Sequence, residues 1–303
     1  KDISFKDIKK RYDAVYIATG SPLPEKINIP GEVLPGVIHG LNFLKSVNLG
    51  KGVAIGKTVA VIGGGNTAID SARTAVRLGA EKVIILYRRT IDAMPALKTE
   101  IREALYEGVE IMELVSPVKF IAGKDGKLES ILCRRMALSN FDKTGRRRTE
   151  PIEGSEFLVH VDTCIPAVSQ YSDLPFIKKE EVSITPWGTF VIDTETQMTT
   201  MEGVFAGGDV VRGPDTVIWA IADGKKAASS IDKYLGGTGK LNKGMPIDIP
   251  DVYDEDEVVT LKRFPMEMLS VEERKDTFDE VIVGYHKLNA IAESMRCLHC
   301  ERR

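Results

Sequence analysis

The sequence predicts an α/β protein built around parallel strands. Short apolar runs bounded by Gly and Pro alternate with longer segments of helical periodicity, a pattern typical of strand–helix–strand units. The runs are apolar throughout, as in parallel sheets that are covered on both faces. The chain has 303 residues, which corresponds to about two domains at the usual ~150 residues each.

Three strands are expected in the first part of the chain. They cover residues 15–18, 59–62 and 83–87. Each strand stops at a polar or glycine-rich turn, and these turns begin at Thr19, Gly63 and Arg88. Ligands of open α/β sheets bind at such strand ends, so Thr19 and Gly20 are candidate contacts. Residues 67–79 read as one helix between the second and third strands.

From residue 110 to 190 the pattern changes to short strand-like pieces and turns. We expect a hairpin tip at 143–145 and interpret the following triple Arg, 146–148, as solvated rather than as a binding patch. Residues 12–18 and 161–167 resemble each other, as two related nucleotide-binding units would, although so short a match also arises by chance.

The composition is that of an ordinary globular chain. It holds 41 Lys plus Arg against 44 Asp plus Glu, a formal charge of -3, and 43% apolar residues. This balance argues against a nucleic-acid-binding or disordered protein. No run approaches the ~18 consecutive apolar residues of a membrane-spanning helix, so no membrane span is expected. Four cysteines are too few for a disulfide scaffold and favour a cytoplasmic location.

The strongest local signal is the strand at 59–62 followed by the spacing Gly63-x-Gly65-x-x-Ala68 and a helix. Gly63 permits a tight turn, Gly65 lets a pyrophosphate approach the backbone, and Ala68 lets the helix pack closely on the strand. The amides at the helix start, at Asn66 and Thr67, would face the anion. The pattern predicts a dinucleotide site, and the alternative is a tightly packed turn without a ligand.

Two arginines end the next strand, where a site that prefers NAD would usually place an acid. Arg88 and Arg89 can each donate two parallel hydrogen bonds to a 2′-phosphate, which favours NADPH over NADH. The alternative is a pair of exposed arginines without a ligand.

A second nucleotide-like turn contains Gly208 and Asp209 and precedes a helix over 217–228. The Asp209 carboxylate could accept from a sugar or ribityl hydroxyl, and the amides at Thr216 and Val217 could stabilise negative charge on a reduced ring. The alternative is a structural Gly-rich turn.

A Cys-x-x-Cys pair, Cys297 and Cys300, stands at the end of the sequence. Such a pair can be redox-active, half of a zinc site, or part of an iron–sulfur ligand set that needs two more ligands. We favour cluster ligation, most simply of a [4Fe–4S] cluster, over an inert or redox pair. Cys133 and Cys164 lie inside strand patterns and are interpreted as buried apolar side chains.

Together these motifs resemble the glutamate synthase small-subunit family, which includes electron-bifurcating transhydrogenase relatives. The resemblance rests on residues 12–20, 61–70, 87–89 with 94–96, 206–209 and 296–300. It covers nearly the whole chain. It implies a flavoprotein with two Rossmann-like dinucleotide-binding domains, in which an NADP domain is inserted into an FAD domain.

The resemblance also implies domain bounds and site residues. Residues 1–50 would close part of the FAD domain and form a linker, 51–170 the NAD(P)-binding domain, 171–240 the return of the FAD domain, and 241–303 an acidic tail. The implied NADP contacts are Gly63, Gly65, Asn66, Thr67 and Ala68 for the pyrophosphate and Arg88 and Arg89 for the 2′-phosphate. The implied flavin contacts are Thr19, Gly20, Gly208, Asp209, Thr216 and Val217.

The sequence departs from the family pattern in two places. The expected FAD-binding Gly-x-Gly-x-x-Gly does not precede Tyr12, and the first residue is Lys1, so we expect a piece of a longer polypeptide. Where the family commonly reads Ala-Ile-Gly-Gln, residues 167–170 read Ala-Val-Ser-Gln, which predicts a turn of different shape.

The resulting hypothesis is an electron-transfer module in which NADPH reduces FAD and the flavin passes electrons to iron–sulfur clusters, some of them on a partner subunit. No catalytic side chain is required. The first alternative is the NADP(H)-binding flavin subunit of an electron-bifurcating transhydrogenase that couples NADH, ferredoxin and NADPH. The second is a non-catalytic assembly scaffold, which would predict loss of Gly63, Gly65 or Asp209, and all three are present.

Overall fold

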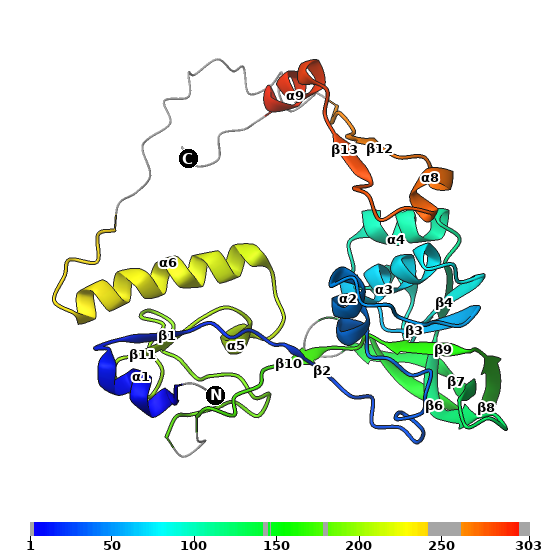
Figure 1. The fold of residues 1–303 in the computed structure, drawn as a ribbon, viewed down its shortest axis with the longest axis horizontal. Coiled ribbons are helices and arrows are strands. Elements are labelled where there is room, and N and C mark those ends of the chain that lie inside the picture. The colour runs from blue at the N-terminus through cyan, green and yellow to red at the C-terminus, as the bar shows by residue number, and fades with distance from the viewer. Residues whose placement is uncertain (1–2, 142–144, 146, 178–180, 242–261, 297–303) are drawn as a thin grey trace. The chain divides into compact units, whose positions relative to one another are not determined.

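The computed structural model describes residues 3–141, 145, 147–177, 181–241 and 262–296. Contacts divide the chain into two units. The first consists of 1–76 and 80–242, and the second of 77–79 and 243–303. Figure 1 labels most of the elements of both.

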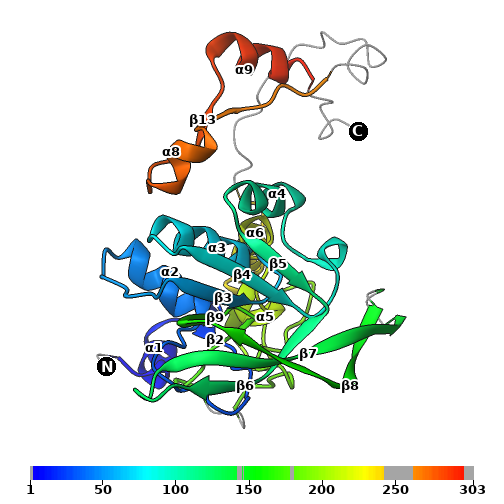
Figure 2. The same ribbon diagram turned by 90° about the vertical axis from the view of Figure 1, so that its right-hand side faces the viewer.

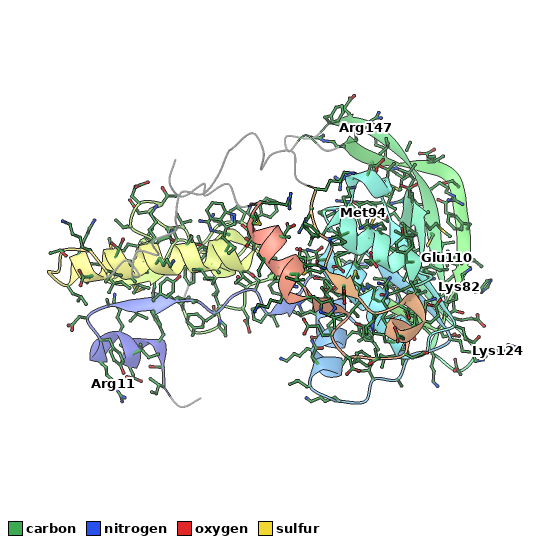
Figure 3. All side chains as sticks on the ribbon, turned by 90° about the horizontal axis from the view of Figure 1, so that it is seen from above. Arg11, Lys82, Met94, Glu110, Lys124 and Arg147 are labelled. Atoms are coloured by element: carbon green, nitrogen blue, oxygen red, sulfur yellow. The ribbon has the colours of Figure 1, made fainter. Side chains whose placement is uncertain are left out.

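A four-stranded parallel sheet forms the centre of the first unit, in the strand order β5-β4-β3-β9. The strands are β3 (Thr58–Ile62), β4 (Lys82–Tyr87), β5 (Glu110–Glu113) and β9 (Thr163–Pro166). An ion pair of 3.1 Å between Lys82 Nζ and Glu110 Oε2 joins the starts of β4 and β5, and Figure 3 shows the two residues beside each other. The parallel strands expected at 59–62 and 83–87 are therefore present as neighbours.

The two faces of this sheet are buried by different elements. Helix α3 (Asn66–Arg77) follows β3 and buries Ala68, Ile69, Ala72 and Ala75. On the opposite face, a second sheet contributes to one continuous apolar core with β3 and β4 (Figure 2). Its antiparallel strands are β6 (Val115–Ala122), β7 (Leu128–Phe141) and β8 (Arg147–His160). Burial on both faces explains why β3 and β4 are apolar after their first residues, Thr58 and Lys82.

Strands β7 and β8 are 14 residues long, whereas short pieces were expected in this region. An unbroken alternation of polar and apolar residues would identify a long strand. Here the alternation is interrupted by register shifts between Arg134 and Met136 and between Leu138 and Phe141. Arg147 and Arg148 are exposed, as the interpretation of a solvated hairpin tip requires, and the rest of that tip lies outside the described residues.

A smaller group of elements surrounds a second core in the same unit. Strands β1 and β11 pair in parallel, and β2 and β10 pair antiparallel. The remaining elements of this unit are α1 (Phe5–Arg11), β1 (Val15–Ile17), β2 (Leu23–Pro24), α2 (Gly40–Asn48), η1 (Ile91–Ala93), α4 (Lys98–Tyr106), β10 (Gln170–Tyr171), β11 (Val204–Ala206), α5 (Asp209–Arg212) and α6 (Val217–Tyr234). The core packs Ile17, Phe190 and Val210 with Val204 and Ala206 of β11.

The described part of the second unit contains two short helices and a two-stranded antiparallel sheet. They are β12 (Glu267–Met268), α8 (Val271–Lys275), β13 (Ile282–Gly284) and α9 (Lys287–Ser294). A capping box between Ser270 and Glu273 starts α8. No helix in the described ranges is long and apolar enough to cross a membrane.

Candidate functional site

A cavity of about 880 Å³ opens in the first unit at the carboxyl ends of β3, β4 and β9. Residues from both candidate turns line it. The candidate residues in its wall are Gly63, Gly65, Asn66, Thr67, Arg88, Arg89 and Asp209. The turns after β3 and β4 meet here because carboxyl ends of parallel strands share one edge of a sheet. The Asp209 turn follows β11, which belongs to a separate two-stranded sheet with β1, so tertiary packing brings it to the same cavity.

The three glycines after β3 are required for three different reasons. Gly63 has φ +145°, and a Cβ there would lie 2.3 Å from the carbonyl oxygen of Ala167. A Cβ on Gly64 would lie 2.4 Å from the ring of Tyr87. A Cβ on Gly65 would meet nothing within 4 Å. Gly65 is thus the position where the cavity, rather than the protein, occupies the space beside the backbone.

Helix α3 begins at this open position. The carbonyl oxygen of Gly65 accepts from the amides of Ala68 and Ile69 at 3.0 and 3.2 Å. The preceding amides, at Asn66 and Thr67, have no partner within a helix and belong to residues of the cavity wall. Ala68 is fully buried behind the turn, so it serves the packing and does not touch the cavity. This arrangement fits a pyrophosphate at the helix start.

A segment after β4 is tied to the glycine turn by two hydrogen bonds and to the end of β4 by a third. The amide of Ala96 donates to the carbonyl of Gly64 at 3.1 Å, the amide of Leu97 donates to Asn66 Oδ1 at 3.0 Å, and the Tyr87 hydroxyl donates to the carbonyl of Ala93 at 3.0 Å. The side-chain oxygen of Asn66 is therefore used to hold this segment. Sequence reasoning missed the role, because no spacing rule links residues 66 and 97.

The two arginines differ in their surroundings. Arg88 is exposed at the cavity wall, and its side chain makes no ion pair or hydrogen bond with the described residues. Arg89 is half-buried, and its Nε donates to the carbonyl of Arg147 on β8 at 2.9 Å. The geometry leaves Arg88 available to an anion and gives Arg89 a structural contact in addition.

The second turn follows β11. Gly208 has φ +73°, and Asp209 begins α5 with its carboxylate at the cavity wall. Asp209 Oδ1 accepts from the amide of Asp215 at 3.3 Å, which leaves Oδ2 without a hydrogen-bond partner among the described residues. That oxygen fits the expected acceptor for a sugar or ribityl hydroxyl.

The other candidate flavin contacts lie near this turn but outside the cavity wall. Ile17 of β1 pairs with Ala206 of β11, so Thr19 and Gly20 follow at the same sheet edge. Thr216 is the N-cap of α6, and Val217 is 74% exposed. The described residues fit part of a flavin nucleotide, at its sugar, and do not form a complete enclosure.

The four cysteines fall into two groups. Cys133 and Cys164 are free and buried in the core between the two sheets, as expected. Burial raises the pKa of Cys133 to about 12 and raises that of Cys164 well above its usual value. Cys297 and Cys300 lie outside the described residues. Within the described ranges, no group of His, Cys, Asp and Glu is arranged to hold a metal ion.

A parallel sheet with a glycine turn and an arginine pair at its carboxyl edge is typical of nucleotide-binding oxidoreductases. The family model described as pyridine nucleotide-disulphide oxidoreductase matches residues 4–224. The chain belongs to this family of oxidoreductases.

The curated relatives confirm the resemblance seen in the motifs. The chain is 40% identical over 248 residues to the glutamate synthase [NADPH] small chain of Azospirillum brasilense, covering 77% of this chain and 51% of that protein. It is 39% identical over 313 residues to the NADP(+)-dependent formate dehydrogenase subunit beta of Moorella thermoacetica, covering 99% of this chain and 44% of that protein. The chain thus spans about half the length of these relatives.

Solved structures confirm the α/β fold class. FprA of Mycobacterium tuberculosis superposes with a TM-score of 0.65 at 20% identity, over 77% of this chain and 66% of that one. Thioredoxin reductase of T. acidophilum gives 0.55 at 22% identity, over 73% and 65%. At these identities the likeness concerns the fold alone.

Proposed function

We propose that this chain is the nucleotide-binding part of a flavoprotein that moves electrons between NADP(H) and FAD. The observation that carries the proposal is the cavity whose wall contains the glycine turn, Arg88 and Asp209 together. A relative of similar sequence, from Geobacter sulfurreducens, is an NADPH-Fe(3+) oxidoreductase subunit beta, 36% identical over 339 residues and covering 100% of this chain and 50% of that protein.

The chain's own residues would bind and orient the nicotinamide nucleotide. The amides of Asn66 and Thr67 would bind the pyrophosphate above Gly65, where a Cβ would have no neighbour within 4 Å. Arg88 would contact the 2′-phosphate, with Arg89 beside it, and this pair favours NADPH over NADH.

The second turn would hold the flavin at its sugar, through Asp209, while Gly208, Thr19 and Gly20 shape the neighbouring backbone. The amide at Val217, at the start of the 18-residue helix α6, would favour negative charge on the flavin, whereas the amide at Thr216 already donates to Asp215 Oδ1 at 2.8 Å. The flavin supplies hydride and single-electron chemistry when bound, and the protein supplies binding and orientation. No side-chain acid or base is assigned.

The electron acceptor is proposed to be an iron–sulfur or flavin partner. Relatives with 39% and 36% identity are named as beta subunits, which supports partner subunits for this chain as well. Cys297 and Cys300 remain proposed cluster ligands, and the domain bounds at 50, 170 and 240 remain proposals. The free thiols of Cys133 and Cys164 support the proposed cytoplasmic location.

The test is anaerobic reduction of the purified whole protein. After reconstitution with FAD, mixing with NADPH should bleach the oxidised flavin absorbance near stoichiometry, and NADH at the same concentration should do so at least tenfold more slowly. A protein that takes up no FAD, or whose bound flavin neither nucleotide reduces, would contradict the proposal.

A further inference from the structure

A buried carboxylate lies beneath the second turn. Asp223, in the middle of the largely exposed helix α6, is 2% exposed. Asp223 Oδ2 accepts from the amide of Gly208 at 2.9 Å and from Arg212 Nε at 2.7 Å. Asp223 Oδ1 accepts from an Arg212 Nη at 2.7 Å and from Gln197 Nε2 at 3.4 Å. One side chain therefore joins the end of β11, the end of α5 and helix α6.

The ion pair joins α5 to α6 across the loop between them. Arg212 is the last residue of α5, the loop 213–216 follows it, and Asp223 lies in the second turn of α6. The amide of Asp215, in this loop, donates to Asp209 on α5. Arg212 also lies over the ring of Trp219, 4.8 Å from its centre, in the first turn of α6. The loop between the two helices is thus fixed from both sides.

The charges around Asp223 keep it ionised. The bidentate hydrogen bonds from Arg212 lower its pKa, burial opposes this, and the Gly208 amide and Lys226 lower it further. Tyr16 is a neighbour of Asp223, because a Cβ on Gly207 would lie 2.3 Å from the Tyr16 hydroxyl and 2.8 Å from Asp223 Cβ. Burial, and after it the Asp223 charge, raises the pKa of Tyr16. Leaving the buried Asp223 charge without its partner would cost free energy of folding, so the folded protein keeps Arg212 in hydrogen-bonding position.

We infer that Asp223 and Arg212 are positioning residues for flavin binding: their ion pair, buried at Asp223 and exposed at Arg212, holds the Gly208–Asp209 turn and the start of α6 beside the cavity. This inference rests on the proposed function. Arg212 and Asp223 do not line the cavity, whereas Asp209, which they position, does. Because Asp209 and the α6 start are both set by the same pair, its loss affects two flavin contacts at once.

The test compares Asp223→Asn with Asp232→Asn in the whole protein. Asp232 is a matched control, because it lies on the same helix, about 14 Å further along at 1.5 Å per residue, and its carboxylate likewise accepts a backbone amide, from Gly239 at 2.7 Å. The dissociation constants for FAD and for NADPH are measured separately on apoprotein by fluorescence titration, and the midpoint potential of the flavin by spectroelectrochemistry.

The FAD dissociation constant of the Asp223→Asn protein should rise at least tenfold, while its NADPH dissociation constant and both constants of the Asp232→Asn protein stay within twofold of wild type. If the displaced α6 start also weakens binding of reduced flavin by a further tenfold, the midpoint potential falls by about 30 mV. Arg212→Lys, which keeps the charge and loses the two parallel hydrogen bonds, should give a smaller loss of FAD affinity with the same selectivity and serves if Asp223→Asn does not fold.

Equal FAD affinity in the Asp223→Asn and Asp232→Asn proteins would overturn the inference, as would a parallel loss of FAD and NADPH affinity, which indicates a general fold defect. If the wild-type protein binds FAD in these experiments, the proposed function stands even when the inference fails. If the wild-type protein binds no FAD, both the proposed function and the inference are wrong.

Discussion

The three consecutive glycines after β3 offer a test that separates folding from ligand binding. Replacing each in turn by Ala adds one methyl group at three neighbouring backbone positions. At Gly64 the methyl carbon would lie 2.4 Å from the Tyr87 ring, and at Gly63 it would lie 2.3 Å from the Ala167 oxygen at a backbone φ of +145°. At Gly65 it would have no neighbour within 4 Å.

The expected changes in the free energy of unfolding follow from these distances. Overpacking at Gly64 should cost about 1–3 kcal/mol. Gly63→Ala adds backbone strain of about 1–3 kcal/mol to a similar overpacking cost, because the atom that it meets is backbone and cannot rotate away. Gly65→Ala changes only an N-cap and should cost no more than about 1 kcal/mol. Nucleotide affinity should show the reverse order, with Gly65→Ala weakening NADPH binding tenfold or more, at least ~1.4 kcal/mol.

Urea unfolding of the nucleotide-free proteins, followed by fluorescence titration with NADPH, measures both quantities on the same samples. The Gly64→Ala protein is the matched control, since it should lose stability with a smaller loss of affinity per folded molecule. The reasoning fails if Gly65→Ala destabilises the protein as much as Gly64→Ala does, or if it leaves the NADPH dissociation constant unchanged.

Three further outcomes are expected. Arg88→Ala should weaken NADPH binding by about 1.5–3 kcal/mol, the value of a hydrogen bond to a charged group, and hardly affect NADH; equal losses in parallel titrations would remove the 2′-phosphate assignment. Tyr87→Phe deletes the hydrogen bond to Ala93 and should lower the free energy of unfolding by about 0.5–1.5 kcal/mol; unchanged urea midpoints would exclude a stabilising contact. Burial raises the pKa of Cys133 to about 12, whereas the thiol of the unfolded chain has a pKa near 9. The neutral thiol therefore stabilises the folded protein fully below pH 9, and this contribution to the free energy of unfolding is lost as the pH rises toward 12. In a pH series of unfolding curves, Cys133→Ser should flatten that decline.

Much of the first unit was predictable from local patterns. The strands at 59–62 and 83–87 and the helix after Gly65 were expected within one or two residues, because apolar runs and glycine turns act over a few neighbouring positions. Helix α6 continues to Tyr234 although only 217–228 was expected, and Gly224, within the expected range, does not break it.

Other parts of the candidate site carried no local signal. The pairing of Asp223 with Arg212, the hydrogen bond from Leu97 to Asn66, and the contact of Arg89 with the carbonyl of Arg147 join residues 11 to 58 positions apart. Asn66 and Arg89 belong to motifs, but their partners Leu97 and Arg147 lie outside those motifs, and Arg212 and Asp223 belong to none. Such contacts depend on which elements fold against each other, and no spacing rule encodes them.

The sequence by itself determined the class of the protein, the glycine turn before α3 and the arginine pair after β4, because these features depend on backbone conformations and charges that neighbouring residues specify. Only the tertiary structure decided that, among the three glycines, an added Cβ would meet open space at Gly65 alone, that Arg88 and Arg89 have different surroundings, and that Asp209 shares a cavity with them. The physical reason is that steric exclusion and buried ion pairing act through space, between atoms that the chain brings together only when it folds.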